Sequence, residues 1–309
     1  MTIKLGLQIP NFSYGTGVPQ IFPTVVAQAH EAEAAGFDSV FLMDHLYQLP
    51  GLGTPDQPML EAYTTLGALA AVTERVQLGT LVTGNTYRNP ALLAKEITTL
   101  DVISQGRAIL GIGTGWFELE HDSLGYEFGT FTDRFNKLHE ALEIILPMLK
   151  GERPTFTGKY YKTVEAMAEP RFRDHVPLMI GGSGEKKTIP LAAKHFDHLN
   201  IIAGFDELPR KIQVVRESCE KIGRDPATLE TSMLVVAIIG DGITADFIPE
   251  DFRQQAVFGS PEQVADQIKT KVLDAGVDGV ILSPVTSLDG YHAGPVTEVA
   301  EKLKPVLAG

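Results

Sequence analysis

Apolar runs of strand length alternate along this chain with longer stretches whose apolar positions repeat at the helical period. The short runs predict strands over residues 4–10, 38–43, 76–82, 107–112, 176–180, 198–202, 230–239 and 279–283. The longer stretches predict helices over residues 18–35, 59–73, 90–104, 131–150, 186–195, 208–223, 261–276 and 297–307. Because parallel strands need long crossovers, this alternation predicts an α/β fold with parallel pairing, and its eight units are the count of a (β/α)8 TIM barrel.

The main alternative is a doubly wound open sheet, which carries a glycine fingerprint for dinucleotides after its first strand. Residues 11–17 (NFSYGTG) lack that spacing. No low-complexity linker or change of composition divides the chain. We therefore expect one TIM-barrel domain over residues 1–309.

Two segments are longer than the connections of a minimal barrel, and both are predicted insertions. Residues 116–131 read as a polar and aromatic loop after the fourth strand, and residues 240–259 follow the seventh. Long loops in compact domains are usually functional or mobile. Residues 153–164 predict a hairpin with a glycine in its turn. The sequence Ser-Pro-Glu-Gln at 260–263 predicts a capping box that starts a helix.

Charge and composition narrow the class of partner. The net charge of −13 disfavours nucleic acid and anionic membranes as partners, but a local site can still bind a small anion through backbone amides. The longest apolar run, residues 233–239, is too short to span a bilayer, and residues 4–10 read as a strand rather than a leader. We expect a cytoplasmic protein. The single cysteine, Cys219, precludes an internal disulfide and is expected to be a small buried side chain.

Chemically distinctive residues gather where the predicted strands end. The strand over 107–112 runs directly into a glycine-rich turn, and the other strand ends are of similar character. These residues are Asp44 and His45 after the second strand, Thr80, Leu81, Val82 and Thr83 at the third, Gly113, Thr114, Gly115, Trp116 and Glu118 after the fourth, and Gly181, Gly182, Ser183 and Gly184 after the fifth. In a barrel they converge on one mouth, which is where active sites of this fold lie.

His45 is the main acid–base candidate. It could act as a general base or donate a hydrogen bond to a cofactor carbonyl, and the alternative is a structural histidine at a strand end. Asp44 precedes it, but neighbours on a strand point to opposite faces, so the two side chains need not touch. No cluster of histidine and carboxylate residues has metal-ligand spacing, so no metal is expected.

Two glycine-rich stretches are candidate cofactor contacts. Residues 181–184 precede a predicted helix, where amides and the helix dipole favour a phosphate, although such loops are also common turns. Small residues over 78–85 leave room for a flat ring, or they are ordinary packing inside the barrel. Tyr126 lies in residues 125–129, which could form the wall of a substrate pocket or have only a structural role.

The chain resembles the bacterial luciferase-like flavin and deazaflavin oxidoreductases over nearly its full length. The segments that carry the resemblance are 5–10 (LGLQIP), 34–40 (AAGFDSV) leading to Asp44-His45, 78–80 (LGT), 88–95 (RNPALLAK), 99–107 (TLDVISQGR), 111–116 (GIGTGW) and 177–184 (PLMIGGSG). The pattern looks most like the branch that depends on the deazaflavin coenzyme F420.

The resemblance implies a TIM-like barrel with an insertion after strand seven and a flavin-like ring in the mouth. It implies a phosphate at the loop after strand five, a non-proline cis peptide bond at Leu81–Val82 against the ring, and a homodimer. Trp116 stands where the sugar-phosphate dehydrogenase branch has a glutamate. A tryptophan there favours a more apolar organic substrate.

Three functional hypotheses follow. The first is an oxidoreductase that passes a hydride between F420 and an organic substrate, with His45 as proton donor or acceptor and Glu118 as a weaker second candidate. The second keeps the fold and uses reduced FMN and oxygen as a monooxygenase. The third is a barrel that binds a cofactor without catalysis.

Overall fold

The computed structural model describes residues 3–240, 253–286 and 290–307. Within them, eight parallel strands close into a barrel. In their order around it, the strands are β1 (Leu5–Ile9), β2 (Ser39–Leu42), β3 (Gln77–Thr80), β5 (Ala108–Gly113), β8 (Leu178–Gly181), β9 (His198–Ile201), β10 (Glu230–Ile239) and β12 (Gly279–Val285). The β1–β12 pairing closes the ring, which confirms the TIM barrel and excludes the open sheet.

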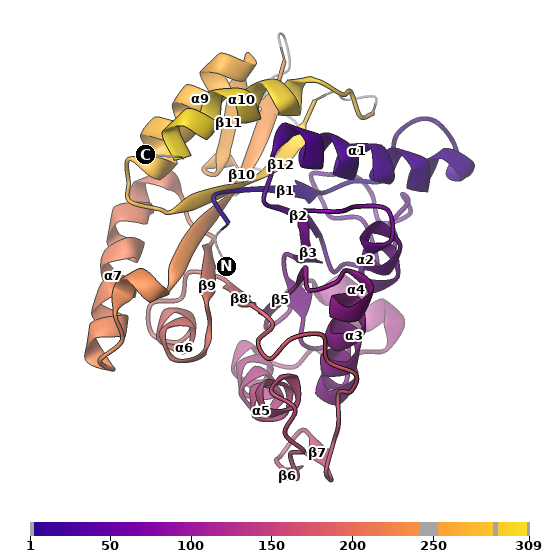
Figure 1. Ribbon diagram of the computed structural model, residues 1–309, viewed down its shortest axis with the longest axis vertical. Helices are drawn as coiled ribbons and strands as arrows, with labels where there is room; N and C mark the ends of the chain where they lie inside the picture. The colour runs from indigo at the N-terminus through magenta and orange to yellow at the C-terminus, as the bar shows by residue number, and fades with distance from the viewer. Residues whose placement is uncertain (1–2, 241–252, 287–289, 308–309) are drawn as a thin grey trace.

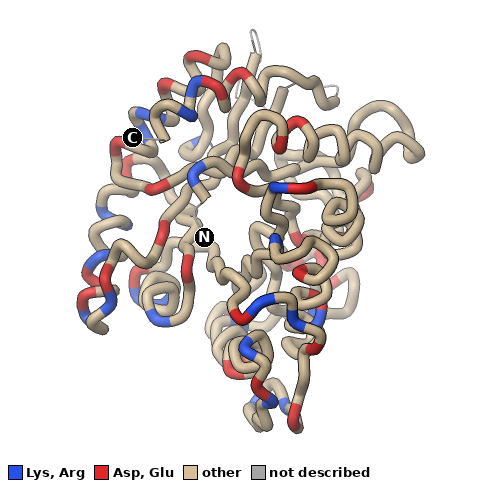
Figure 2. Tube along the Cα trace, in the orientation of Figure 1, with Lys and Arg blue, Asp and Glu red and all other residues tan. Residues whose placement is uncertain are grey.

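Helices surround the strands, and the charged residues lie mainly on these helices and on the loops (Figures 1 and 2). The helices are α1 (Ile21–Ala35), α2 (Ala62–Ala70), α3 (Pro90–Ile103), α5 (Phe131–Leu149), α6 (Thr188–His195), α7 (Leu208–Lys221), α9 (Pro261–Ile268) and α10 (Pro295–Leu307). The predicted capping box is present, since Ser260 Oγ accepts the Gln263 N–H and Gln263 Oε1 accepts the Ser260 N–H. Cys219 is buried, as expected.

The predicted insertions are only partly irregular. Residues 116–131 were expected to form a loop, but they contain a short helix, α4 (Glu118–Leu124), which ends at Gly125 with φ of 77°. In the segment after β10, a further strand, β11 (Ala256–Gly259), pairs with β10. Residues 241–252 of that segment lie outside the described residues.

The predicted hairpin over 153–164 is confirmed by antiparallel pairing of β6 (Phe156–Thr157) with β7 (Lys162–Thr163). It lies beside α5 (Figure 1). The Glu140 carboxylate of α5 accepts the backbone N–H groups of Lys159, Tyr160 and Tyr161.

Alternate residues of the strands build two separate cores. One set, which includes Val40, Leu110 and Ile180, packs outward against the helices. The other set packs together inside the barrel and comprises Ile3, Phe41, Leu81, Ile109, Met179 and Ile281. Each fully buried large side chain contributes about 1.5–3 kcal/mol to folding. The barrel interior is therefore filled, and an opening for chemistry is left only at its ends.

Glycines let β3 and β5 approach closely, and Gly111 is the tighter case. A Cβ atom added there would overlap the carbonyl oxygen of Thr80. We expect Gly111→Ala to lower the free energy of unfolding by about 1–3 kcal/mol, because backbone cannot move aside as a flexible side chain can. Gly67→Ala is the matched control. Gly67 lies inside α2 with no other group near its added Cβ, so we expect a gain of about 0.5–1 kcal/mol. Denaturant unfolding measures both, and equal effects would contradict the packing argument.

Candidate active site at the mouth of the barrel

The carboxyl ends of the parallel strands bring the predicted site residues to one end of the barrel. Leu42 of β2 and Thr80 of β3 are register partners, and so are Ile112 of β5 and Ile180 of β8. Because these strands are parallel, the segments that follow β2, β3, β5 and β8 leave neighbouring strands at the same end of the barrel. This is the end of the barrel at which catalytic groups are found in this fold.

Val82 forms a platform between two glycines. The Leu81–Val82 peptide bond is cis, as the resemblance implies, and the chain then continues as a short strand, β4 (Thr83–Gly84), beside β5. A Cβ atom on Gly113 or on Gly181 would lie 2.9 or 3.1 Å from Val82 Cγ2. Only glycine at those positions lets β5 and β8 close on Val82 in this way.

Thr80 and Thr83 flank the Leu81–Val82 pair in the chain and are completely buried. Their hydroxyl oxygens are 2.6 Å apart, and the hydroxyl group of Tyr63 lies 2.6 Å from Thr83 Oγ1. The Thr80 hydroxyl is also within hydrogen-bond distance of the Gly111 carbonyl oxygen. These hydroxyl groups satisfy one another inside the protein, and Val82, which is half-buried, is more accessible than Thr80 and Thr83.

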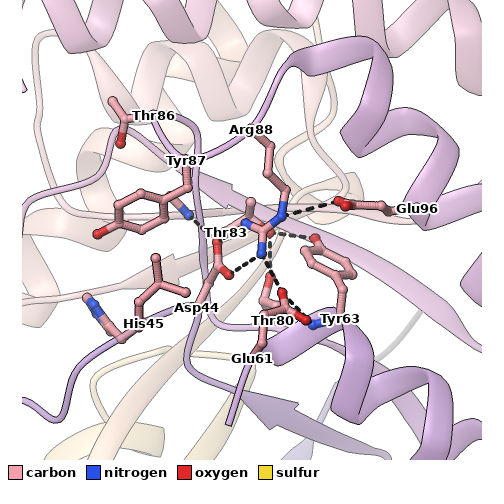
Figure 3. Close-up of polar contacts among 12 residues, drawn as sticks. Asp44, His45, Glu61, Tyr63, Thr80, Thr83, Thr86, Tyr87, Arg88 and Glu96 are labelled. Carbon is pink, nitrogen blue, oxygen red and sulfur yellow. Dashed lines mark hydrogen bonds and ion pairs between the residues drawn. The ribbon is translucent and has the colours of Figure 1, made fainter. Parts of the chain in front are cut away.

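Asp44 is buried and belongs to an ion cluster centred on Arg88, whose other carboxylates are partly exposed (Figure 3). Its carboxylate accepts hydrogen bonds from Arg88 Nη1 at 2.6 Å, from Arg88 Nη2 at 2.8 Å and from the Gly84 N–H at 3.0 Å. Arg88 also pairs with Glu61 at 2.8 Å and with Glu96 at 3.2 Å. Burial raises the pKa of the Asp44 carboxyl group, and the Arg88 guanidinium opposes that rise. The Arg88 guanidinium is therefore the shared counter-ion of three carboxylates.

His45 points away from that cluster, as Figure 3 shows. Its side chain is 12% exposed, and Nδ1 lies 2.9 Å from Oε2 of Glu120, which belongs to α4. The rings of Trp116 and Phe117 meet the imidazole ring edge to face, with centroids 5.7 and 5.8 Å away. The predicted candidate is thus a partly exposed imidazole held between a carboxylate and two aromatic rings.

Glu120 is completely buried and was not predicted from the sequence. Besides His45, it accepts hydrogen bonds from the Tyr87 hydroxyl group and from the backbone N–H groups of Leu46 and Tyr47. Burial acts to raise its pKa, but the hydrogen bond and charge of His45 and the hydrogen bonds from Tyr87 and Tyr47 outweigh burial, so its pKa lies below the ordinary value for glutamate. Glu118, the predicted second acid, is exposed at the first residue of α4.

The insertion also supplies the aromatic rim of the site. Trp116 is 54% exposed, and Tyr126 is exposed beside the Tyr87 ring, with 5.4 Å between centroids. Phe117 joins Trp116 to an apolar cluster that includes Met43 and Leu49. One side of the His45 imidazole is therefore apolar.

The loop over 181–184 precedes α6 and offers backbone donors. Gly182 has φ of 135°, and its N–H bonds to the carbonyl oxygen of Asn200. The amides of Ser183 and Gly184 have no hydrogen-bond partner within the described part of the chain. Lys187 follows, with its ammonium group 5.3 and 5.1 Å from the ring centroids of Phe131 and Phe135. The loop can therefore receive an anion.

Metal and membrane features are absent from residues 3–240, 253–286 and 290–307. No group of three or more histidine, cysteine or carboxylate residues there could hold a metal ion. None of the helices there is long and apolar enough to cross a membrane.

The site thus consists of an imidazole and a glycine-rich loop at the carboxyl end of a parallel barrel, and comparisons with known proteins place the chain in a family. Residues 3–246 match the model of the luciferase-like monooxygenase family, and the chain belongs to that family. The resemblance drawn from the sequence is confirmed at this level.

Two curated relatives of the chain bear the names of F420-dependent dehydrogenases. The F420-dependent glucose-6-phosphate dehydrogenase of Microbacterium testaceum is 42% identical over 160 residues, which is 51% of this chain and 46% of that protein. The match thus spans about half the length of that relative. The F420-dependent hydroxymycolic acid dehydrogenase of Mycobacterium tuberculosis is 31% identical over 90% of this chain and 76% of its own length.

A solved structure has the same fold at low identity. An F420-dependent secondary alcohol dehydrogenase in complex with an F420–acetone adduct superposes with a TM-score of 0.82, at 21% identity over 99% of both chains. At this identity the likeness concerns the fold alone.

Proposed function

We propose that this protein is an oxidoreductase that passes a hydride between the deazaflavin coenzyme F420 and a small organic substrate. The observation that carries the proposal is the His45 imidazole at the barrel mouth, held by a buried carboxylate on the segment that follows β2, next to the strand β3 that leads into Val82. The F420-dependent relatives support the choice of coenzyme.

The residues at the mouth fit such a coenzyme. Val82, flanked by Gly113 and Gly181, offers a surface without projecting side chains on which a flat ring can lie. Thr114 and Gly115 directly follow Gly113 and extend this contact surface for the ring. The backbone amides of Ser183 and Gly184 can hold a phosphate group of the coenzyme. When bound, F420 would supply the centre that gives or accepts the hydride.

Residues of the protein itself transfer the proton and exclude water from the site. His45 takes a proton from a substrate hydroxyl group, or returns one, at Nε2, because Nδ1 is engaged by Glu120. Phe117 and the apolar cluster behind it exclude water from that side, and the exposed Trp116 ring favours an apolar organic substrate. Glu118, exposed at the rim, has the smaller role as second acid–base group. A homodimer is the expected assembly by resemblance to the family.

An anaerobic assay tests the proposal. Oxidised F420 is mixed with the protein and a series of alcohols of increasing apolar size, and the deazaflavin absorbance is followed. We expect alcohol-dependent reduction of F420. Oxygen consumption with reduced FMN and no reaction with F420 would instead establish the monooxygenase hypothesis. Tight F420 binding without turnover across the series would establish a non-catalytic barrel.

The phosphate role of the loop gives a separate prediction. Ser183→Asp places a negative charge beside the free amides, and we expect the F420 dissociation constant to rise at least about tenfold, which corresponds to about 1.4 kcal/mol. Ser183→Ala keeps the amides and is the matched control, with little change expected. Equilibrium titration measures both. Equal affinities of the two variants would remove the loop from the cofactor site.

A further inference from the structure

We propose that Glu120 is the positioning residue that fixes the tautomer of His45, so that Nδ1 carries the proton and Nε2 presents its lone pair to the mouth. The inference rests on the proposed function only in taking His45 as the group that meets the substrate. The tautomer itself is a property of the protein without any ligand.

The hydrogen-bond inventory of Glu120 assigns the donors. An ionised carboxylate has acceptors only, so every partner of Glu120 must donate. The Leu46 and Tyr47 N–H groups donate to Oε1, and the Tyr87 hydroxyl group donates to Oε2. The remaining partner is Nδ1 of His45 at 2.9 Å. It must therefore carry a proton, and a neutral imidazole then has none on Nε2.

The ionised state of Glu120 does not rest on His45 alone. The Tyr87 hydroxyl group and the backbone N–H groups of Leu46 and Tyr47 also donate to the carboxylate. Its pKa is lowered, because the hydrogen bond and charge of His45 and the hydrogen bonds from Tyr87 and Tyr47 together outweigh its burial. Burial and the Glu120 carboxylate raise the pKa of Tyr87, which keeps that hydroxyl group protonated and able to donate. The other charged groups near Tyr87 are Asp44 and Arg88, which are paired with each other.

Glu120 holds the backbone as well as the ring. Leu46 and Tyr47 directly follow His45 in the chain, so one carboxylate fixes both the end of the strand segment and the imidazole it carries. The helix α4, which carries Glu120, is itself held in place by hydrogen bonds of the next residue. His121 bonds through Nδ1 to the Phe117 carbonyl oxygen at 2.8 Å and through Nε2 to the Thr86 hydroxyl group at 2.7 Å.

During catalysis, Glu120 also stabilises the positive charge that His45 acquires. When His45 takes a proton at Nε2, the ring becomes cationic, and the carboxylate beside Nδ1 stabilises that cation. The nearby Asp44 carboxylate cannot take this role, because Arg88 holds it in a bidentate pair. The insertion after the fourth barrel strand thus supplies the partner on which the candidate base depends.

Nitrogen-15 NMR of the ligand-free protein tests the tautomer directly. Histidines are labelled, and the His45 signals are assigned by their loss in His45→Gln. We expect an Nδ1–H, Nε2-unprotonated pattern in the native protein and a mixture of tautomers in Glu120→Gln. Asp122→Asn is the matched control, since Asp122 is an exposed carboxylate on the same helix, and it should leave the pattern unchanged. An Nε2–H tautomer in the native protein, or an unchanged pattern in Glu120→Gln, would overturn the proposal.

Steady-state kinetics with the coenzyme that supports turnover provide a second test of the role of Glu120. We expect Glu120→Gln to lower kcat at least about tenfold with little change in KM and to shift the pH profile of kcat. Tyr87→Phe removes one donor but keeps the carboxylate, so its effect should be smaller. It also serves as the second variant if Glu120→Gln folds poorly. If no coenzyme supports turnover but the Nδ1–H tautomer is found, the positioning role stands and the proposed function fails.

Discussion

Replacing His45 with alanine lowers kcat by about 10²–10⁴-fold, which is the usual contribution of a positioned general acid–base group. F420 binding is largely spared, because the Val82 platform and the 181–184 loop are separate from the imidazole ring. Steady-state kinetics and an equilibrium titration of the same protein sample measure the two effects side by side.

Two controls make the His45→Ala result specific. Added imidazole should restore part of the lost rate if the missing group is a proton carrier. The His30→Ala variant removes an exposed histidine on α1 whose imidazole lies 2.7 Å from the Val72 carbonyl oxygen, away from the site, and it should keep the native rate. An unchanged kcat in His45→Ala would remove this residue from the mechanism.

Replacing Arg88 with methionine lowers the free energy of unfolding by about 3–5 kcal/mol, because it leaves the buried Asp44 charge without its partner. Glu61 and Glu96 lose the same cation. Without Arg88, the pKa of Asp44 rises further above its value in the unfolded chain. The penalty therefore shrinks as the pH falls and Asp44 takes up a proton. Denaturant unfolding at several pH values measures both the loss and its pH dependence.

The matched control for Arg88 is an exposed arginine. Arg210 pairs with Glu185 at 3.2 Å on the surface, and such pairs contribute about 0–1 kcal/mol. Arg210→Met should therefore change stability little at any pH. Similar losses in the two variants would show that the Arg88 cluster has no special role in the fold.

The sequence predicted the barrel because its signals are local and repeated. Each strand is a short apolar run, and several helices carry their own end signals, such as Gly36 with φ of 81° after α1 and the capping box at Ser260. Closure follows once eight such units are paired in parallel. The residues at strand ends, including His45, could be predicted for the same reason, since their place in the chain fixes their place in the barrel.

The partners of these residues were harder to predict because they are distant in sequence. Glu120 lies 75 residues from His45, and Arg88 lies 44 residues from Asp44. The helix that presents Glu120 has seven residues, which is too short to give a clear periodic pattern, and its polar sequence reads as a loop. One signal was available. A carboxylate such as Asp44 at the end of a buried strand needs a cation, and Arg88 follows the end of the next strand.

The measurement that tests the central claim most directly is a titration of the protein with oxidised F420 and, separately, with FMN, followed by tryptophan fluorescence. Trp116 is the only tryptophan in the chain, and it lies beside His45 at the mouth. We predict saturable quenching by F420 at micromolar concentrations and much weaker quenching by FMN. Stronger binding of FMN, or no quenching by either compound, would contradict the account.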